Sequence, residues 1–209
     1  MAVGPVSLEL DAGLVRLVPL HDVHASDLLA AGNDATIWTY LMEHPKNLDE
    51  MRGLIQRALL SQRSGRELPF AIVEVASGRA IGSTRYEDIL SAHRALEIGW
   101  TWLGLPWQRT VCNTQCKYML LRHAFEVLGM VRVQLKADTR NLRSVAAIER
   151  IGATYEGTLR KHRILPDGYI RDSACYSIVR EEWPAVERRL TALMRSTWAE
   201  TRSDHAHPR

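Results

Sequence analysis

Residues 94–144 constrain the fold of this chain more than any other stretch. A strand pattern at 94–103 is followed by a short cationic loop (QRTVCNTQCK) and an amphipathic helix pattern (YMLLRHAFEVLG). An apolar strand at 131–138 and a second helix pattern follow with almost no spare residues. Two strands joined through a helix are typically parallel neighbours in one sheet, because the crossover returns the chain to its starting end. We therefore expect a parallel pair at the centre of the sheet.

The segments on either side of this unit predict antiparallel strands and further helices. A turn at Pro166-Asp167-Gly168 joins the last two strands. The expected strands are 6–10, 14–20, 68–75, 80–86, 158–165 and 169–179. Three further helices are expected. The first covers 22–31, the second begins at Asn47 or Asp49 and ends at 64–65, and the third begins near Glu181. Together these elements predict an α/β protein with a mixed sheet.

Length and composition favour one domain of 209 residues, with a core at about 6–183, a C-terminal helix at 184–198 and a disordered tail at 199–209. No apolar run is long enough for a membrane span, and no secretory signal is apparent. Three cysteines are too few for a disulfide framework, so a reducing, cytoplasmic location is expected. A net charge of +3 fits a small anionic ligand better than nucleic acid.

Glu97 lies in a strand that is otherwise built for burial. Strand alternation places Leu96, Ile98, Trp100 and Trp102 on one face, and Glu97 on the other with Gly99, Thr101 and Leu103. Buried carboxylates are rare unless they are paired or used in chemistry. Glu97 is therefore either a general base or the partner of a nearby cation such as Arg85.

The helix that follows this strand starts between Arg109 and Lys117, with Asn113 or Thr114 as the expected N-cap. Free N–H groups at such a start can hold a phosphate, although an ordinary capped helix has the same pattern. Asn141 and Ser144 lie at the start of the next helix and likewise either cap the helix or contact the ligand. Cys112 and Cys116 have too few ligands nearby for a metal, so we expect core packing and no metal site.

An ordered set of short motifs gives the chain a family resemblance over about residues 6–183. The set comprises Glu-Ile-Gly-Trp at 97–100, Asn-Thr-Gln-x-Lys at 113–117, His-Ala-Phe-Glu at 123–126, Leu-Gly at 128–129, Arg-Asn-x-x-Ser at 140–144, Ile-Gly-Ala at 151–153, Glu-Gly-x-Leu-Arg at 156–160 and Tyr-Ser-Ile at 176–178. Together they resemble the RimJ/RimL-type branch of the GNAT N-acetyltransferases.

The resemblance implies a seven-stranded mixed sheet whose central parallel strands splay apart to admit the pantetheine arm of acetyl-CoA. It further implies a set of cofactor contacts and places Glu97 where such enzymes often carry the base. The implied cofactor-binding residues are Trp102, Leu103, Gln108, Arg109, Val111, Cys112, Asn113, Thr114, Asn141, Arg143 and Ser144. The chain departs from the family pattern at two places. Val111 and Asn113 replace the small residues of the usual phosphate-binding turn, and Ile148 stands where many of these enzymes have a Tyr as the general acid.

The expected activity is transfer of an acetyl group from acetyl-CoA to a primary amine, such as a protein N-terminus. The acceptor pocket is expected from Trp38, Tyr40, Arg85 and Tyr169. The alternatives are acetylation of a small-molecule amine, such as an aminoglycoside, and a non-catalytic module that binds coenzyme A. Neither nucleic acid nor a membrane is an expected partner. A homodimer is left open.

Overall fold

In the computed structural model, which describes residues 4–11 and 13–204 and side chains only to residue 195, the chain forms a mixed sheet flanked by helices. Within the described residues the sheet has seven strands in the order β1-β2-β3-β4-β5-β7-β6. All neighbouring pairs are antiparallel except β4 and β5, which are parallel as predicted. In the described part of the chain, no helix is both long and apolar enough to cross a bilayer.

The helices and strands follow the predicted order closely. The strands are β1 Val15–Pro19, β2 Leu68–Glu74, β3 Ala80–Leu90, β4 Ala95–Leu103, β5 Arg132–Asp138, β6 Thr154–Ile164 and β7 Ile170–Val179. The α-helices are α1 Ala25–Ala31, α2 Leu48–Arg63, α3 Cys112–Arg122, α4 Leu142–Arg150 and α5 Trp183–Asp204. Short helical turns are η1 Asp22–His24, η2 Ala35–Ile37, η3 Ser91–His93, η4 Leu105–Trp107 and the π-type turn η5 His123–Val127.

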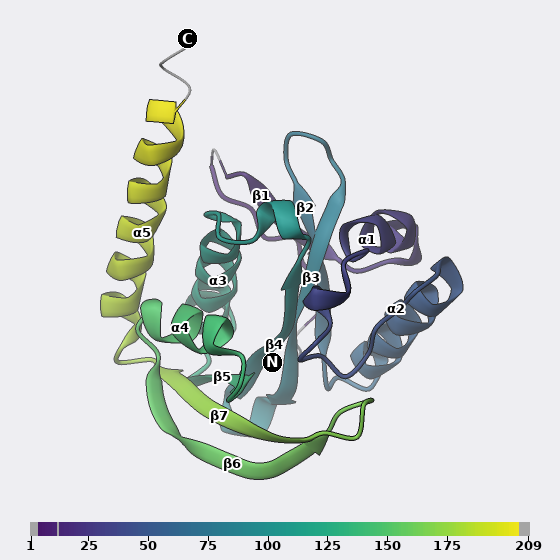
Figure 1. Cartoon of the computed structure of the whole chain (residues 1–209). Coiled ribbons are helices and arrows are strands. Elements are labelled where there is room, and N and C mark those ends of the chain that lie inside the picture. Colours follow the sequence, from purple (N-terminus) through teal and green to yellow (C-terminus); the bar gives the residue numbers. More distant parts are fainter. Residues whose placement is uncertain (1–3, 12, 205–209) are drawn as a thin grey trace.

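Two apolar cores lie on the two faces of the sheet. Residues of α3, α4 and α5, among them Leu120, Ile148 and Leu190, pack on one face. Residues of α1 and α2, among them Leu28 and Ile55, pack on the other. Figure 1 shows α3 and α5 on one side of β4 and α1 and α2 on the opposite side. Because both faces are covered, the central strands are buried and a polar side chain on them has few partners.

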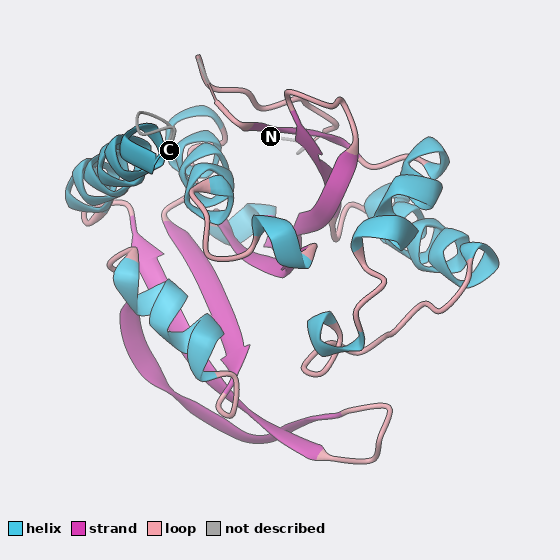
Figure 2. Cartoon of the chain, turned by 45° about the horizontal axis from the view of Figure 1, so that its top comes forward, coloured by secondary structure: helices cyan, strands magenta, loops and turns pink. Residues whose placement is uncertain are grey.

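The central parallel pair comes apart after only three residue pairs. Ala95, Leu96 and Glu97 of β4 lie opposite Arg132, Val133 and Gln134 of β5, and the register ends there. Beyond this point, Ile98–Leu103 and Leu135–Asp138 remain in their strands but no longer pair with each other. Both segments line one cavity. Figure 2 shows β6 and β7 curving below this opening. The splayed centre implied by the family resemblance is confirmed.

A bulge in β4 changes which side chains share a face, so the predicted alternation is wrong beyond Gly99. Three steps of β4, from Gly99 to Trp102, lie opposite two steps of β3, and Trp100 has a φ of +49°. The extra residue turns Leu103 toward the core that holds Leu96 and Ile98, and turns Trp102 toward the other core. Simple alternation fails because a bulge shifts every later side chain to the opposite face.

Several element boundaries differ from the predictions; β3, for example, ends at Leu90 and not at 86. The expected strand at 6–10 is reduced to a single bridge between Leu8 and Leu17. Strand β6 begins at Thr154 because Gly157, with a φ of +141°, is accommodated inside the strand as a bulge. Helix α5 continues to Asp204, past residue 198 where we expected disorder to begin, and residues 205–209 lie outside the described part.

Candidate active site

A cavity of about 820 Å³ occupies the opening between the parted strands. Its walls come from β3, β4 and β5, the start of α3, helix α4 and the β6–β7 hairpin. Ten of the residues singled out in the sequence line it: Tyr40, Glu97, Trp102, Leu103, Gln108, Arg109, Asn113, Asn141, Arg143 and Ser144. The cavity therefore brings together the carboxylate, the cationic loop and the second helix start that the sequence pattern separated.

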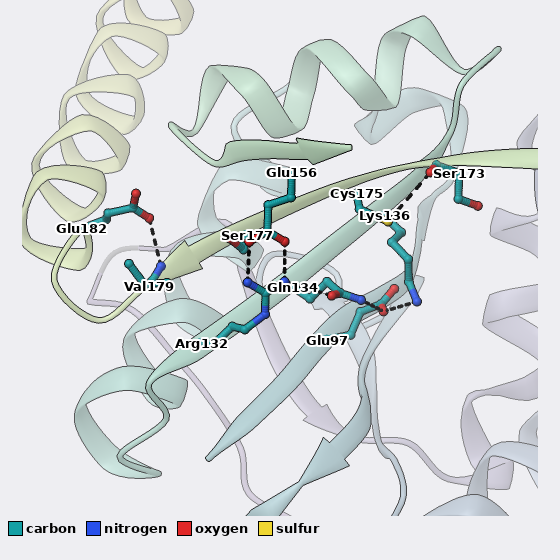
Figure 3. A network of polar contacts seen from close by, with 10 residues as sticks. All are labelled: Glu97, Arg132, Gln134, Lys136, Glu156, Ser173, Cys175, Ser177, Val179 and Glu182. Carbon is teal, nitrogen blue, oxygen red and sulfur yellow. Dashed lines mark hydrogen bonds and ion pairs between the residues drawn. The ribbon is translucent and has the colours of Figure 1, made fainter. Parts of the chain in front are cut away.

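Glu97 stands at the last paired position of β4, where the strands separate, and is only 4% exposed. Its carboxylate forms an ion pair with Lys136 Nζ at 2.7 Å and accepts a hydrogen bond from Gln134 Nε2 at 3.1 Å. Figure 3 shows both partners reaching Glu97 from β5. The alternative partner considered in the sequence, Arg85, was wrong: its guanidinium pairs with Glu67 at 2.7 Å.

A second carboxyl, Glu87 of β3, lies directly opposite Glu97 in the register. It occupies the space above Gly99, since a Cβ placed on Gly99 would lie 1.6 Å from Glu87 Oε1. Burial, followed by the charge of Glu97, raises the pKa of Glu87 to about 8. At neutral pH the Glu87 carboxyl is therefore mostly protonated, and it can donate a hydrogen bond in this wall of the cavity.

Lys117 of α3 is a buried cation in the same cavity. Its Nζ donates to Thr101 Oγ1 at 3.0 Å, and Thr101 Oγ1 lies 2.7 Å from Thr84 Oγ1. Burial lowers the pKa of Lys117 to about 8. The sequence placed Lys117 in the first turn of this helix, beside the expected phosphate site, but α3 begins at Cys112 and Lys117 lies in its second turn, buried against Thr101 of β4.

The start of α3 is formed differently from the prediction, since the helix begins at Cys112 and Val111 takes the N-cap position without a side-chain cap. The hydroxyl of Thr110 accepts from Cys112 N–H at 3.2 Å. The N–H groups of Asn113 and Thr114 have no acceptor among the described residues, as expected for a first turn. Arg109, with a φ of +60°, is exposed at the cavity edge.

Side chains around this turn connect it to the parted strand and to α4. Gln108 Nε2 donates to the carbonyl of Leu103 at 2.8 Å, and Arg143 Nη1 donates to Gln108 Oε1. Asn141 caps α4, because its Oδ1 accepts from Ser144 N–H at 3.1 Å. Both residues also line the cavity, so the cap and the ligand contact are compatible roles. Ile148 is buried in the same wall and offers no acidic proton.

Six of the singled-out residues do not line the cavity. Val111, Cys112 and Thr114 are buried under the start of α3, and Trp38 lies in the second core, where its Nε1 donates to Gly32 O at 2.7 Å. Arg85 places its guanidinium 4.5 Å from the Trp100 ring centre. Tyr169 lies at the tip of the β6–β7 hairpin, 3.3 Å from the Arg140 guanidinium.

Cysteine chemistry is disfavoured in this site. Burial raises the pKa of Cys112 and, more strongly, that of Cys116, so both thiols stay protonated. Among the described residues, no group of three His, Cys, Asp or Glu side chains could hold a metal ion.

Several cavity residues were not singled out as site residues in the sequence, and the signals that could have found them differ. The hairpin spacing of β3 and β4 could have placed Glu87 beside Glu97, had their register been known. Lys136 lies two residues after Gln134 in the same expected strand, so alternation places both side chains on one face, but this is only a weak signal of a site residue. The hairpin near Tyr169 and Arg171 was expected to help build the acceptor pocket, but Arg163 gave no signal, because its position opposite Arg171 depends on a bulge in β6.

The comparisons with known proteins agree with this geometry. The family described as an acetyltransferase (GNAT) domain matches residues 15–154. YdaF of Bacillus subtilis (strain 168), named "Putative ribosomal N-acetyltransferase", is 28% identical over 149 residues, which cover 70% of this chain and 78% of YdaF.

Two solved structures show the same fold. A GCN5-related N-acetyltransferase from Brucella melitensis is 29% identical with a TM-score of 0.85, covering 93% of this chain and 87% of that one. RimJ from Mycobacterium smegmatis, solved in complex with CoA-disulfide, is 24% identical with a TM-score of 0.74, covering 90% and 95%. Both likenesses are to the fold that the sequence resemblance implied. The chain belongs to the GNAT family of acetyltransferases and is an acyltransferase.

Proposed function

We propose that this protein is an acetyl-CoA-dependent N-acetyltransferase that modifies a primary amine, with Glu97 as the general base. The observation that carries the proposal is the position of Glu97, which is buried at the point where β4 and β5 part and borders the cavity between them. A primary amine is mostly an ammonium ion at neutral pH, so it must lose a proton before it can attack an acyl group.

The residues present fit acetyl-CoA. The parted edges Ile98–Leu103 and Leu135–Asp138 offer main-chain groups that could pair with amides of a pantetheine arm. The unpaired N–H groups at the start of α3, with Arg109 and Arg143 close by, provide donors for a pyrophosphate. When bound, acetyl-CoA supplies an activated thioester. The other side chains of the cavity then determine which amine is accepted and where its proton goes.

Glu97 and Glu87 divide the proton handling between them. Glu97 is paired with the Lys136 ammonium and accepts a hydrogen bond from Gln134, so its carboxylate is held in place at the cavity wall as a proton acceptor. Glu87 is mostly protonated, because burial and the neighbouring charge raise its pKa. The pair therefore presents one negative charge to an incoming amine, with a proton donor beside it.

The acceptor amine is proposed to be a protein N-terminus, in line with the naming of YdaF as a ribosomal N-acetyltransferase. Tyr40 and the acidic residues Glu67 and Asp88 line the mouth of the cavity and would contact the acceptor. A small-molecule amine is the second candidate, favoured by the same acidic lining, which would attract a cationic amine.

The test is Glu97→Gln, assayed for release of coenzyme A with saturating acetyl-CoA over a panel of amines and N-terminal peptides. We expect turnover to fall at least 100-fold, since a positioned base typically contributes this much. The exposed Glu181→Gln is the matched control and should keep wild-type turnover. Equal turnover of Glu97→Gln and wild type across pH would refute the base. Tight acetyl-CoA binding without turnover of any amine would support a binding module instead.

A further inference from the structure

Two arginines that the proposed chemistry does not use face the cavity from the β6–β7 hairpin. Arg163 of β6 and Arg171 of β7 lie directly opposite each other in the register, and both line the cavity. A bulge between Leu159 and Arg163, with Lys161 at a φ of +51°, brings His162 to the same wall. Like charges directly opposite on neighbouring strands destabilise a sheet, so this arrangement is costly in the absence of an anion.

Neither guanidinium has an ion-pair partner within the described residues. The Nε atom of Arg171 is buried and finds no hydrogen-bond acceptor there. The carboxylate that acts most strongly on it, Asp138, is already bound by Arg140 at 2.8 Å and 3.1 Å. The Arg140 guanidinium in turn lies 5.5 Å from the ring centre of Tyr40 and 3.3 Å from that of Tyr169, so it connects the hairpin tip to the segment that holds Tyr40. A buried, unpaired donor of this kind is rare in proteins unless a ligand completes it.

The arginine pair belongs to the reacting end of the cavity. The charges that act on Arg171 are those of Asp138, Arg163, Glu97 and Glu87. His162 is influenced by Lys136 and Glu97, and its Nδ1 lies 3.0 Å from Ser173 Oγ. The start of α3, where phosphates of the cosubstrate are expected, presents its own cations, Arg109 and Arg143, from other elements. The hairpin arginines are therefore available to the acceptor.

We propose that Arg163 and Arg171 bind an anionic oxygen group, a carboxylate or a phosphate, that the acceptor carries a short distance from its reactive amine. Two planar guanidinium groups from opposed positions of one hairpin match the paired oxygens of such a group. The acceptor is then doubly charged, with its amine toward Glu97 and its anion toward the hairpin. This inference rests on the proposed acetyltransferase function and narrows its substrate class, and it argues against a purely polycationic acceptor.

The experiment compares acceptors that differ only in the negative charge. The pairs are an Ala-Glu peptide against Ala-Gln, free alanine against alaninamide, and phosphoethanolamine against ethanolamine. Initial rates are measured by coenzyme A release for wild type, Arg163→Gln, Arg171→Gln and the double variant. Arg160→Gln, an exposed arginine of β6 outside the cavity, is the matched control. Calorimetry of the N-acetylated Ala-Glu and Ala-Gln peptides gives a second readout that does not need turnover.

We expect kcat/KM of wild type and Arg160→Gln to favour the anionic member of at least one pair about tenfold, as one charged hydrogen-bonded contact allows. Each cavity variant should lose that preference, and the acetylated product should bind more weakly only when it is anionic. The pair that shows the effect identifies the source of the anion, whether peptide side chain, amino-acid carboxylate or phosphate.

Equal rates within all three pairs in wild type would overturn the inference while leaving the acetyltransferase function intact. A raised KM for acetyl-CoA in Arg171→Gln, with the acceptor preference unchanged, would also overturn it and assign the arginines to the cosubstrate. Absence of turnover with every amine would remove the proposed function, and the inference with it. Circular dichroism of each variant checks the fold, and the calorimetric comparison remains valid for any variant that folds.

Discussion

The two ends of the cavity are built on different principles. At the α3 end, the donors are main-chain N–H groups and the exposed cations Arg109 and Arg143. At the hairpin end, buried carboxyls and cations alternate: Glu97 is paired with Lys136, and Glu87 lies opposite Glu97.

The difference indicates what each end recognises. Main-chain groups and flexible surface cations recognise an anion by its charge and tolerate changes in side chains, because the backbone remains in place. The hairpin end depends on particular buried side chains, each of which loses a partner when its neighbour is changed. Substitutions should therefore have large and coupled effects at the hairpin end and small, additive effects at the α3 end.

The largest effect is expected from Lys136→Met, which would leave Glu97 buried without its cation. Their side chains are 10% and 5% exposed, so solvent cannot replace the lost partner. Breaking a buried pair costs about 3 kcal/mol, which corresponds to a fall in Tm of roughly 6–12 °C in thermal unfolding. The double variant Lys136→Met/Glu97→Gln should recover most of this stability, because no buried charge remains unpaired. If Lys136→Met were as stable as wild type, the hairpin end would not depend on its buried ion pair, and the difference between the two ends would be contradicted.

A smaller effect is expected from Arg109→Ala and Arg143→Ala at the α3 end. Each should weaken acetyl-CoA binding about three- to tenfold, measured by calorimetry, since each removes one exposed charge while the main-chain donors persist. The two effects should add in the double variant, and they should shrink in high salt because exposed charges are screened. The thermal stability of the free protein should not change. A loss of binding in the single variants as complete as in the double variant would show coupling and contradict the distinction.

The third effect, in Glu87→Gln, depends on pH. The pKa of Glu87 rises from 4.5 in its reference state to about 8 in the fold, so between these values the folded state holds more protons than the unfolded state. Its contribution is therefore stabilising at low pH and is lost as pH rises toward 8. Glutamine mimics the protonated form. The free energy of unfolding of Glu87→Gln relative to wild type should therefore increase from pH 5 to pH 9 by an amount on the order of 1–2 kcal/mol, which is followed through the difference in Tm.

The control for this experiment is Glu181→Gln, whose carboxyl is exposed and should leave the pH dependence of Tm unchanged. A difference between Glu87→Gln and wild type that stays constant with pH would show that burial of Glu87 is not linked to its protonation in the way the structure indicates.

The chain pattern by itself determined the element order, the parallel placement of β4 and β5, the Asn141 cap and the burial of Glu97, because these follow from local periodicity, turn chemistry and connection length. It did not determine the partner of Glu97, the face of Trp102 or the pairing of Arg163 with Arg171. Those depend on where strands bulge and how far two neighbours stay in register. A single inserted residue reverses all later side chains without leaving a signal in their own sequence, so only the tertiary structure could decide which charges meet in the cavity.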